Sequence, residues 1–194
     1  MNDVLVLIRR ADAIELVPSR ALRRAMAVLV FALLTALGAF VSVPLPGTPV
    51  PVSLQTLFVS VSGVLLGARL GALAQVAYLA AGIAGLPVFT GGGAGPGHLL
   101  GPTGGYLIAF PAAAYVTGWL APRAGRSRAL LGVAIAIGTL VVFAGGVAQL
   151  ALLLGDLSEA LRLGLVPFLA GDAVKILLAL LIALPLRDRT LGQL

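Results

Sequence analysis

Long apolar runs separated by short polar, glycine-rich or proline-rich segments form the pattern of this chain. Some of these runs approach the roughly 20 residues that a bilayer-spanning helix needs, and the second and fourth are shorter. Short runs predict tilted or broken helices that pack against their neighbours. The runs predict six helices, over residues 25–43, 54–67, 70–86, 106–121, 129–155 and 165–186.

The composition agrees with a membrane protein. Of the 194 residues, 60% are hydrophobic and only 10% are charged, and the mean hydropathy is +1.11. A soluble domain of this length would need more polar residues to cover its surface. We therefore predict an all-α integral membrane protein, with a six-helix domain over residues 25–189. Residues 1–24 would form a cytoplasmic or interfacial segment, or equally a disordered tail, and residues 190–194 a cytoplasmic tail.

Two features favour a first run that is retained as a helix over a cleaved signal peptide. The run is long for a signal sequence, and a proline-rich stretch follows it in place of a small-residue cleavage site.

The positions of the basic residues predict the orientation. With the N-terminus inside, the cytoplasmic segments hold 11 of the 13 basic residues, whereas the outer connections hold only Arg162, and Lys175 lies within the last run. This asymmetry follows the positive-inside rule and places both termini in the cytoplasm. It also accounts for the net charge of +6 without a nucleic-acid partner, while favouring attraction to anionic lipids.

Several classes of site are not expected. The chain has no cysteine, and His98 is its only histidine, so neither a thiolate metal site nor a histidine cluster can form. We predict no enzyme activity, no metal and no cofactor. The glycine-rich connection, residues 87–105, lacks the GK[ST] ending of a phosphate-binding loop. It is interpreted as a lid over an outward-facing pocket or as a flexible connector.

An acid and a base stand inside the last apolar run. Asp172 and Lys175 are three residues apart, which puts both on one helix face, and Lys175 lies about 16 Å along its helix, near the midplane. Each charge costs about 2.5–3.5 kcal/mol there. Three interpretations stay open: an ion pair without a ligand, a proton relay, or the polar floor of a ligand site. We favour the third, since Gly171 permits close approach. Gln55 and Tyr106 flank the outer connections as further pocket candidates.

Three stretches resemble the biotin transporter BioY family. They are VPLPGTPVPVSLQTLF from residue 43, GLPVFTGGGAGPGHLLGPTGGYL from residue 85, and GDAVK from residue 171. The resemblance covers about residues 25–186. It implies the fold and function of the substrate-binding S component of an energy-coupling factor (ECF) transporter in the bacterial plasma membrane. Such a component binds biotin from outside, and its partners are a transmembrane scaffold subunit and two ATPase subunits.

The resemblance also implies roles for individual residues. Asp172 would accept the ureido N–H groups of biotin, and Lys175 would bind a ligand oxygen or neutralise Asp172. Ala32 and Ala36 would contact the scaffold subunit. Further ligand contacts would come from Gln55, Tyr106, Gly92, Gly93, Thr103, Gly104 and Gly105.

Two alternatives remain open at this stage. One is an S component for another vitamin, and the other is a small membrane transporter outside the ECF class. Whether the chain acts alone, as a homo-oligomer or only with partners is also open.

Overall fold

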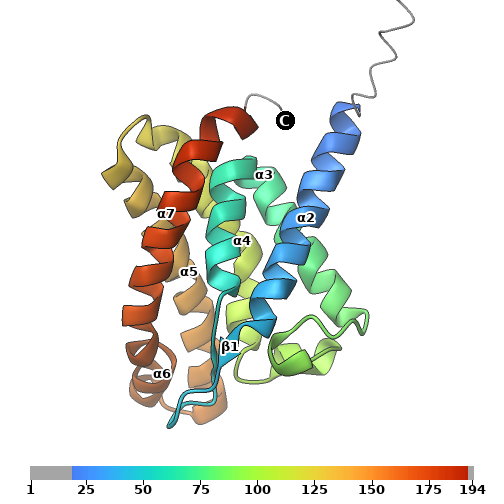
Figure 1. Cartoon of the computed structure of the whole chain (residues 1–194). Coiled ribbons are helices and arrows are strands. Elements are labelled where there is room, and N and C mark those ends of the chain that lie inside the picture. The colour runs from blue at the N-terminus through green and yellow to red at the C-terminus, as the bar shows by residue number, and fades with distance from the viewer. Residues whose placement is uncertain (1–18, 192–194) are drawn as a thin grey trace, which may run out of the picture.

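The structure is a computed structural model that describes residues 19–191, and side chains as far as residue 187. It is built almost entirely of helices (Figure 1). A two-residue antiparallel ladder joins β1 (Ser42–Val43) to β2 (Val52–Ser53) between the first two helices. The helices are α2 (Arg20–Phe40), α3 (Gln55–Ile83), α4 (Gly104–Leu120), α5 (Arg128–Leu154), α6 (Leu157–Gly164) and α7 (Leu169–Leu191). Short 3₁₀ turns are η1 (Thr90–Gly92), η2 (Pro96–Leu100), η3 (Ala121–Ala124) and η4 (Val166–Phe168).

Each of the six predicted apolar runs lies mainly in a helix, although the first ends in β1 and the third extends past the end of α3. The predicted helical membrane class is confirmed. Four stretches of the described chain are long and apolar enough to cross a bilayer: Arg20–Phe40, Gln55–Ile83, Arg128–Leu154 and Leu157–Arg187. α4 has 17 residues, and the second and third runs are joined in α3, so six separate spans are not established by length alone.

α3 is continuous in sequence but broken at Gly67. This residue has φ 78° and ψ 177°, a conformation that is accessible essentially to glycine alone. The side chains on either side of the break remain connected, because Gln75 Nε2 donates to Ser62 Oγ at 3.0 Å. Gly118 of α4 fits against the break, where a Cβ atom would come within 2.5 Å of the Ala68 nitrogen. The break therefore shapes the packing of α4 on α3.

Replacing Gly67 by Ala is expected to destabilise the protein by about 1–3 kcal/mol, because the backbone conformation is strained for any residue with a Cβ atom. The measurement is the midpoint of thermal unfolding in detergent. Gly132→Ala in α5 is the matched control, since a Cβ atom there meets nothing within 4 Å. An equal midpoint for the two variants would contradict the strain at Gly67.

The two ends of the helix bundle differ in charge. The start of α2 and the end of α7 lie at one end, and the β1–β2 hairpin and α6 lie at the other (Figure 1). Arg187 joins the arginine-rich segment 121–128 to α7, since it donates to the carbonyls of Ala121 (2.6 Å) and Gly125 (2.8 Å). Arg162 is on α6, at the opposite end. This separation is the one that the positive-inside pattern predicts.

The predicted polar connection after α5 is partly a helix. Asp156 caps α6, because its Oδ1 accepts from the N–H groups of Ser158 (2.7 Å) and Glu159 (3.2 Å). The N–H groups of Glu159 and Ser158 hold the pKa of Asp156 below its ordinary value. α6 buries Ala160 in a small cluster with Val147 and Leu150 of α5. α6 is therefore a packed element at the end of the bundle that carries the hairpin.

Candidate ligand-binding site

A cavity opens between the helices at the end that carries the hairpin and α6. It encloses about 540 Å³ of empty space, part of which is open to solvent. Its polar lining consists of Ser53, Gln55, Thr56, Thr90, Thr103, Thr139, Asp172 and Lys175. Its apolar lining includes Val50, Tyr106, Leu107, Phe110, Val142, Phe143 and Phe168.

Asp172, Lys175 and Thr56 form a closed polar triad in this cavity. Lys175 Nζ lies 2.8 Å from Asp172 Oδ1, and the Thr56 hydroxyl donates to the same oxygen at 3.1 Å while accepting from Lys175 at 3.1 Å. Both charged residues are buried, with 5% and 7% of their surface exposed. Asp172 Oδ2 has no hydrogen-bond partner among the described residues. The triad thus keeps a carboxylate oxygen and an ammonium hydrogen free for a ligand.

Thr56 was not among the residues predicted from the sequence. Thr56 follows Gln55 at the start of α3 and is 116 residues away from Asp172 of α7 in the sequence. A single threonine near a helix start is too common to signal a site. Only the packing of α3 against α7 brings it to the charged pair.

Gln55 is buried beside the cavity and connects three segments. Its Oε1 accepts from the hydroxyls of Ser53 and Thr90, both at 2.9 Å, and its Nε2 donates to the Tyr78 hydroxyl at 2.5 Å. Tyr78 in turn donates to the Val88 carbonyl at 3.2 Å. Since both lone pairs of Oε1 are used, Gln55 chiefly positions Ser53 and Thr90, and only one amide hydrogen remains for a ligand.

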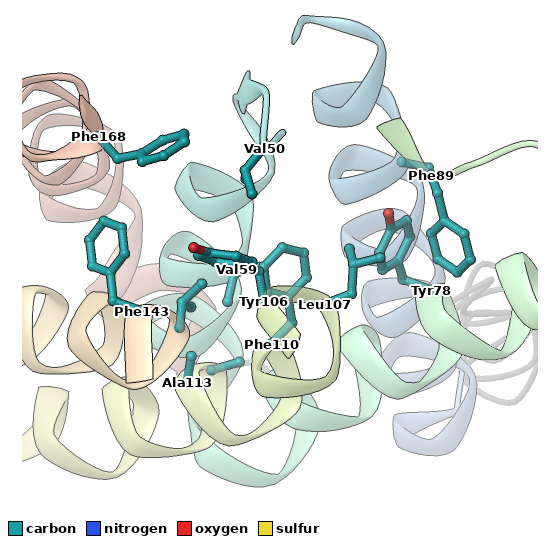
Figure 2. Close-up of a cluster of buried hydrophobic side chains, with 13 residues drawn as sticks. Val50, Val59, Tyr78, Phe89, Tyr106, Leu107, Phe110, Ala113, Phe143 and Phe168 are labelled. Carbon is teal, nitrogen blue, oxygen red and sulfur yellow. The ribbon is translucent and has the colours of Figure 1, made fainter. Parts of the chain in front are cut away.

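Tyr106 forms part of the apolar wall and is held from both ends. Its hydroxyl donates to the Gly164 carbonyl at 2.8 Å, which joins α4 to the end of α6. Its ring lies against Gly146, where a Cβ atom would come within 2.1 Å of the ring. Figure 2 shows this ring in the middle of the buried cluster, with Phe143 and Phe168 to one side and Phe89 to the other. The aromatic face is therefore available to a ligand, whereas the hydroxyl is already engaged.

The glycine-rich connection is fastened to the helices around it. The Phe89 ring is fully buried against Gly82 of α3, and the His98 ring stacks on it at 5.1 Å between centroids. On the α5 side, Gln149 Nε2 donates to two carbonyls of the connection at 2.7 and 2.8 Å. Because of these contacts, the glycine-rich connection forms an ordered cover and not a flexible connector. Thr90 and Thr103 are its residues that line the cavity.

The four glycines predicted as ligand contacts do not line this cavity. Gly93 lies beneath the His98 ring, which a Cβ atom would approach to 2.4 Å. Gly104 and Gly105 permit close backbone contacts, since a Cβ atom at either position would clash with the carbonyl of Leu99 or of Gly145, respectively. Gly92 has φ 75° and forms part of the turn. These glycines shape the walls of the site through backbone packing, so direct ligand contact is not supported by this geometry.

The small residues predicted to contact a partner face the protein's own interior. Ala36 is 5% exposed within the main hydrophobic cluster, and Ala32 packs against that cluster. The outward face of α2 carries large side chains instead: Leu29, Leu33 and Leu37 are each at least half exposed. In this conformation a partner that approaches α2 would meet chiefly the leucines, because Ala36 is buried and Ala32 is partly buried.

Comparison with known proteins gives a consistent result. The family model described as BioY matches residues 10–191. The chain belongs to the BioY family. This BioY-family chain is 40% identical over 163 residues to a probable biotin transporter BioY of Pyrococcus horikoshii, covering 84% of this chain and 95% of that protein. It is also 40% identical to the biotin transporter BioY of Thermotoga maritima, over 81% of this chain and 92% of that one.

A solved structure has the same fold. It is the S-component for biotin from an ECF-type ABC transporter, with a TM-score of 0.82 and 27% sequence identity. The match covers 89% of this BioY-family chain and 95% of that structure. The predicted membership of the family and the S-component fold are both confirmed.

Proposed function

We propose that this chain is the biotin-binding S component of an ECF vitamin uptake transporter, which captures biotin from outside and delivers it inward. The observation that carries the proposal is the buried triad of Asp172, Lys175 and Thr56 on the wall of an otherwise largely apolar cavity, in a member of the BioY family. The family's relatives and the matching S component supply the identity of the vitamin.

The chemistry of biotin fits the lining of the cavity. The ureido ring presents two N–H donors, which suit a carboxylate that only accepts, and Asp172 has one oxygen without a partner among the described residues. The thioether ring and the aliphatic chain need an apolar wall, which Tyr106, Phe143 and Phe168 supply. Lys175 would donate its remaining hydrogen to the ureido oxygen or to the valerate carboxylate.

Transport would need a source of energy other than this chain itself. The sequence has no phosphate-binding GK[ST] motif, so we propose that a transmembrane scaffold subunit and two ATPase subunits drive release of biotin inward. The exposed leucines of α2 are the proposed scaffold contact in place of Ala32 and Ala36. The proposed location is the bacterial plasma membrane, with the arginine-rich end in the cytoplasm.

The test is equilibrium binding of labelled biotin to the purified chain in nanodiscs, with thiamine and riboflavin as competitors. We expect saturable binding at one site, which unlabelled biotin removes and the other vitamins do not. A folded chain that binds no biotin, or binds another vitamin in its place, would refute the assignment.

Biotin methyl ester decides which end of the ligand meets Lys175. If Lys175 binds the valerate carboxylate, the ester should bind the parent more weakly than biotin does, and Lys175→Met should abolish this difference. If Lys175 instead binds the ureido oxygen or serves only Asp172, the difference should persist in the variant. Both results are compatible with biotin binding, and they separate the two roles of Lys175.

A further inference from the structure

A basic hollow lies at the end of the bundle opposite the ligand cavity, between the start of α5 and the end of α7. Its charged lining is Arg126, Arg128 and Arg187, beside the apolar residues Leu184 and Pro185. Arg187 is held in place by the carbonyls of η3 and of the residue that follows it, at 2.6 and 2.8 Å. Arg126 and Arg128 are exposed and form no ion pair with the side chains that the structure describes.

The charges of this hollow are not balanced within the described part of the chain. The acids with described side chains are Asp156 and Glu159 at the opposite end and Asp172 in the ligand cavity. Asp188 follows Arg187 in the sequence, and counting it against the three arginines still leaves two positive charges (3 − 1 = 2). An anion from outside the chain would balance them.

The first turn of α5 adds backbone donors to the same hollow. Ser127 lines it and caps the helix, because its hydroxyl oxygen accepts from the Leu130 N–H at 3.2 Å. The N–H groups of Arg128 and Ala129 precede the first intrahelical hydrogen bond and have no partner within the helix. These N–H groups lie at the N-terminus of the 27-residue helix, where the helix dipole favours an anion.

An apolar groove begins next to the hollow and indicates what kind of anion would bind. It runs between α4 and α5, past Leu130, Val133 and Ile137, and has about 360 Å³ of empty space. Arg123 stands at its rim, with its guanidinium 3.8 Å from the centre of the Trp119 ring. The groove and the basic hollow are adjacent, because Ala124 lines the groove and the next residue, Gly125, lines the hollow. A ligand that carries both a phosphate and an acyl chain would fit both surfaces, with the phosphate in the basic hollow and the chain in the apolar groove.

We propose that the basic hollow binds the phosphate of an anionic phospholipid of the cytoplasmic leaflet, with an acyl chain along the adjacent α4–α5 groove. The arginines supply the charge and fork geometry that suit a phosphate. The groove distinguishes a lipid from a soluble phosphate, because a soluble anion would leave it empty. The site therefore makes the chain selective for anionic lipid at its cytoplasmic end.

Trp119 provides the readout, because it is the only tryptophan of the chain and stands beside the groove. The full chain is placed in bilayers of phosphatidylcholine that contain either brominated phosphatidylglycerol or brominated phosphatidylcholine, with bromine near the glycerol end of the acyl chain. Quenching of Trp119 should show preference for phosphatidylglycerol, by about five-fold for each arginine that contributes. Equal quenching by the two lipids would overturn the proposal.

Arg126→Gln/Arg128→Gln should reduce this preference to about that of a neutral surface, while biotin binding at the opposite end stays unchanged. Arg162→Gln is the matched control, since it removes an exposed arginine from the other end and should leave the preference intact. If both variants lose it equally, the effect is one of net charge and the proposal fails. If inorganic phosphate at millimolar concentration displaces phosphatidylglycerol, the hollow is a site for soluble anions and the lipid assignment fails.

Discussion

Asp172→Asn is expected to weaken biotin binding by about 10- to 150-fold. Hydrogen bonds to a charged group contribute about 1.5–3 kcal/mol, and each 1.4 kcal/mol is a factor of ten in affinity. Asparagine keeps the shape of Asp172 but replaces one acceptor oxygen by a donor and removes the charge. The measurement is the dissociation constant of labelled biotin in nanodiscs. Glu159→Gln is the matched control, because it makes the same change from carboxylate to amide at a half-buried residue of α6 that does not line the ligand cavity.

The same substitution leaves Lys175 buried without its 2.8 Å partner, so unfolding must be measured beside binding. Removing one member of a buried ion pair costs about 3–5 kcal/mol. Asp172→Asn/Lys175→Met removes both charges and should recover much of this stability. Continued loss of biotin binding by a stable double variant would place the charged pair in the ligand site. Full affinity of the single variant would contradict that role and leave the pair as a structural ion pair.

Gly146→Ala is expected to weaken biotin binding by about ten-fold or more. The new Cβ atom would lie 2.1 Å from the Tyr106 ring, which is also tied to Gly164 by its hydroxyl and has little freedom to move away. The ring would shift toward the cavity that it lines. Overpacking of this kind costs about 1–3 kcal/mol, so the midpoint of thermal unfolding should fall as well.

Gly132→Ala is the control on the same helix, since its Cβ atom has open space around it. Alanine is the better helix former by about 1 kcal/mol, so this variant should be at least as stable as the parent and should bind biotin normally. Gly146→Ala that loses stability but keeps full affinity would show that the Tyr106 ring moves away from the ligand. That result would remove Tyr106 from the binding wall.

The contacts of the glycine-rich connection have a consequence for ligand exchange. Phe89 on Gly82, His98 on Phe89 and the two hydrogen bonds of Gln149 hold the cover at separate points. The hairpin on the other side of the cavity is tied to the end of α6, because the Thr48 hydroxyl donates to the Leu163 carbonyl at 2.8 Å. Entry of a ligand between these segments would need at least one of these contacts to open.

The sequence determined the features that depend on composition and local spacing. Long apolar runs exclude a soluble fold, and arginine placement predicts the orientation of the chain in the membrane. A spacing of three residues puts Asp172 and Lys175 on one helix face. The pair could be singled out because charges inside a lipid-facing run are costly and therefore rare. Membership of the BioY family also followed from local stretches of sequence.

The tertiary structure alone decided which faces meet. Ala32 and Ala36 turn inward while the leucines of α2 face out, and Thr56 reaches Asp172 across 116 residues of sequence. Gly104 and Gly105 were expected at the ligand but serve close backbone packing. A run that is apolar on all sides carries no hydrophobic period to indicate its inner face. Helix contacts of this kind depend on shape and backbone approach between distant segments, which no single stretch of sequence encodes.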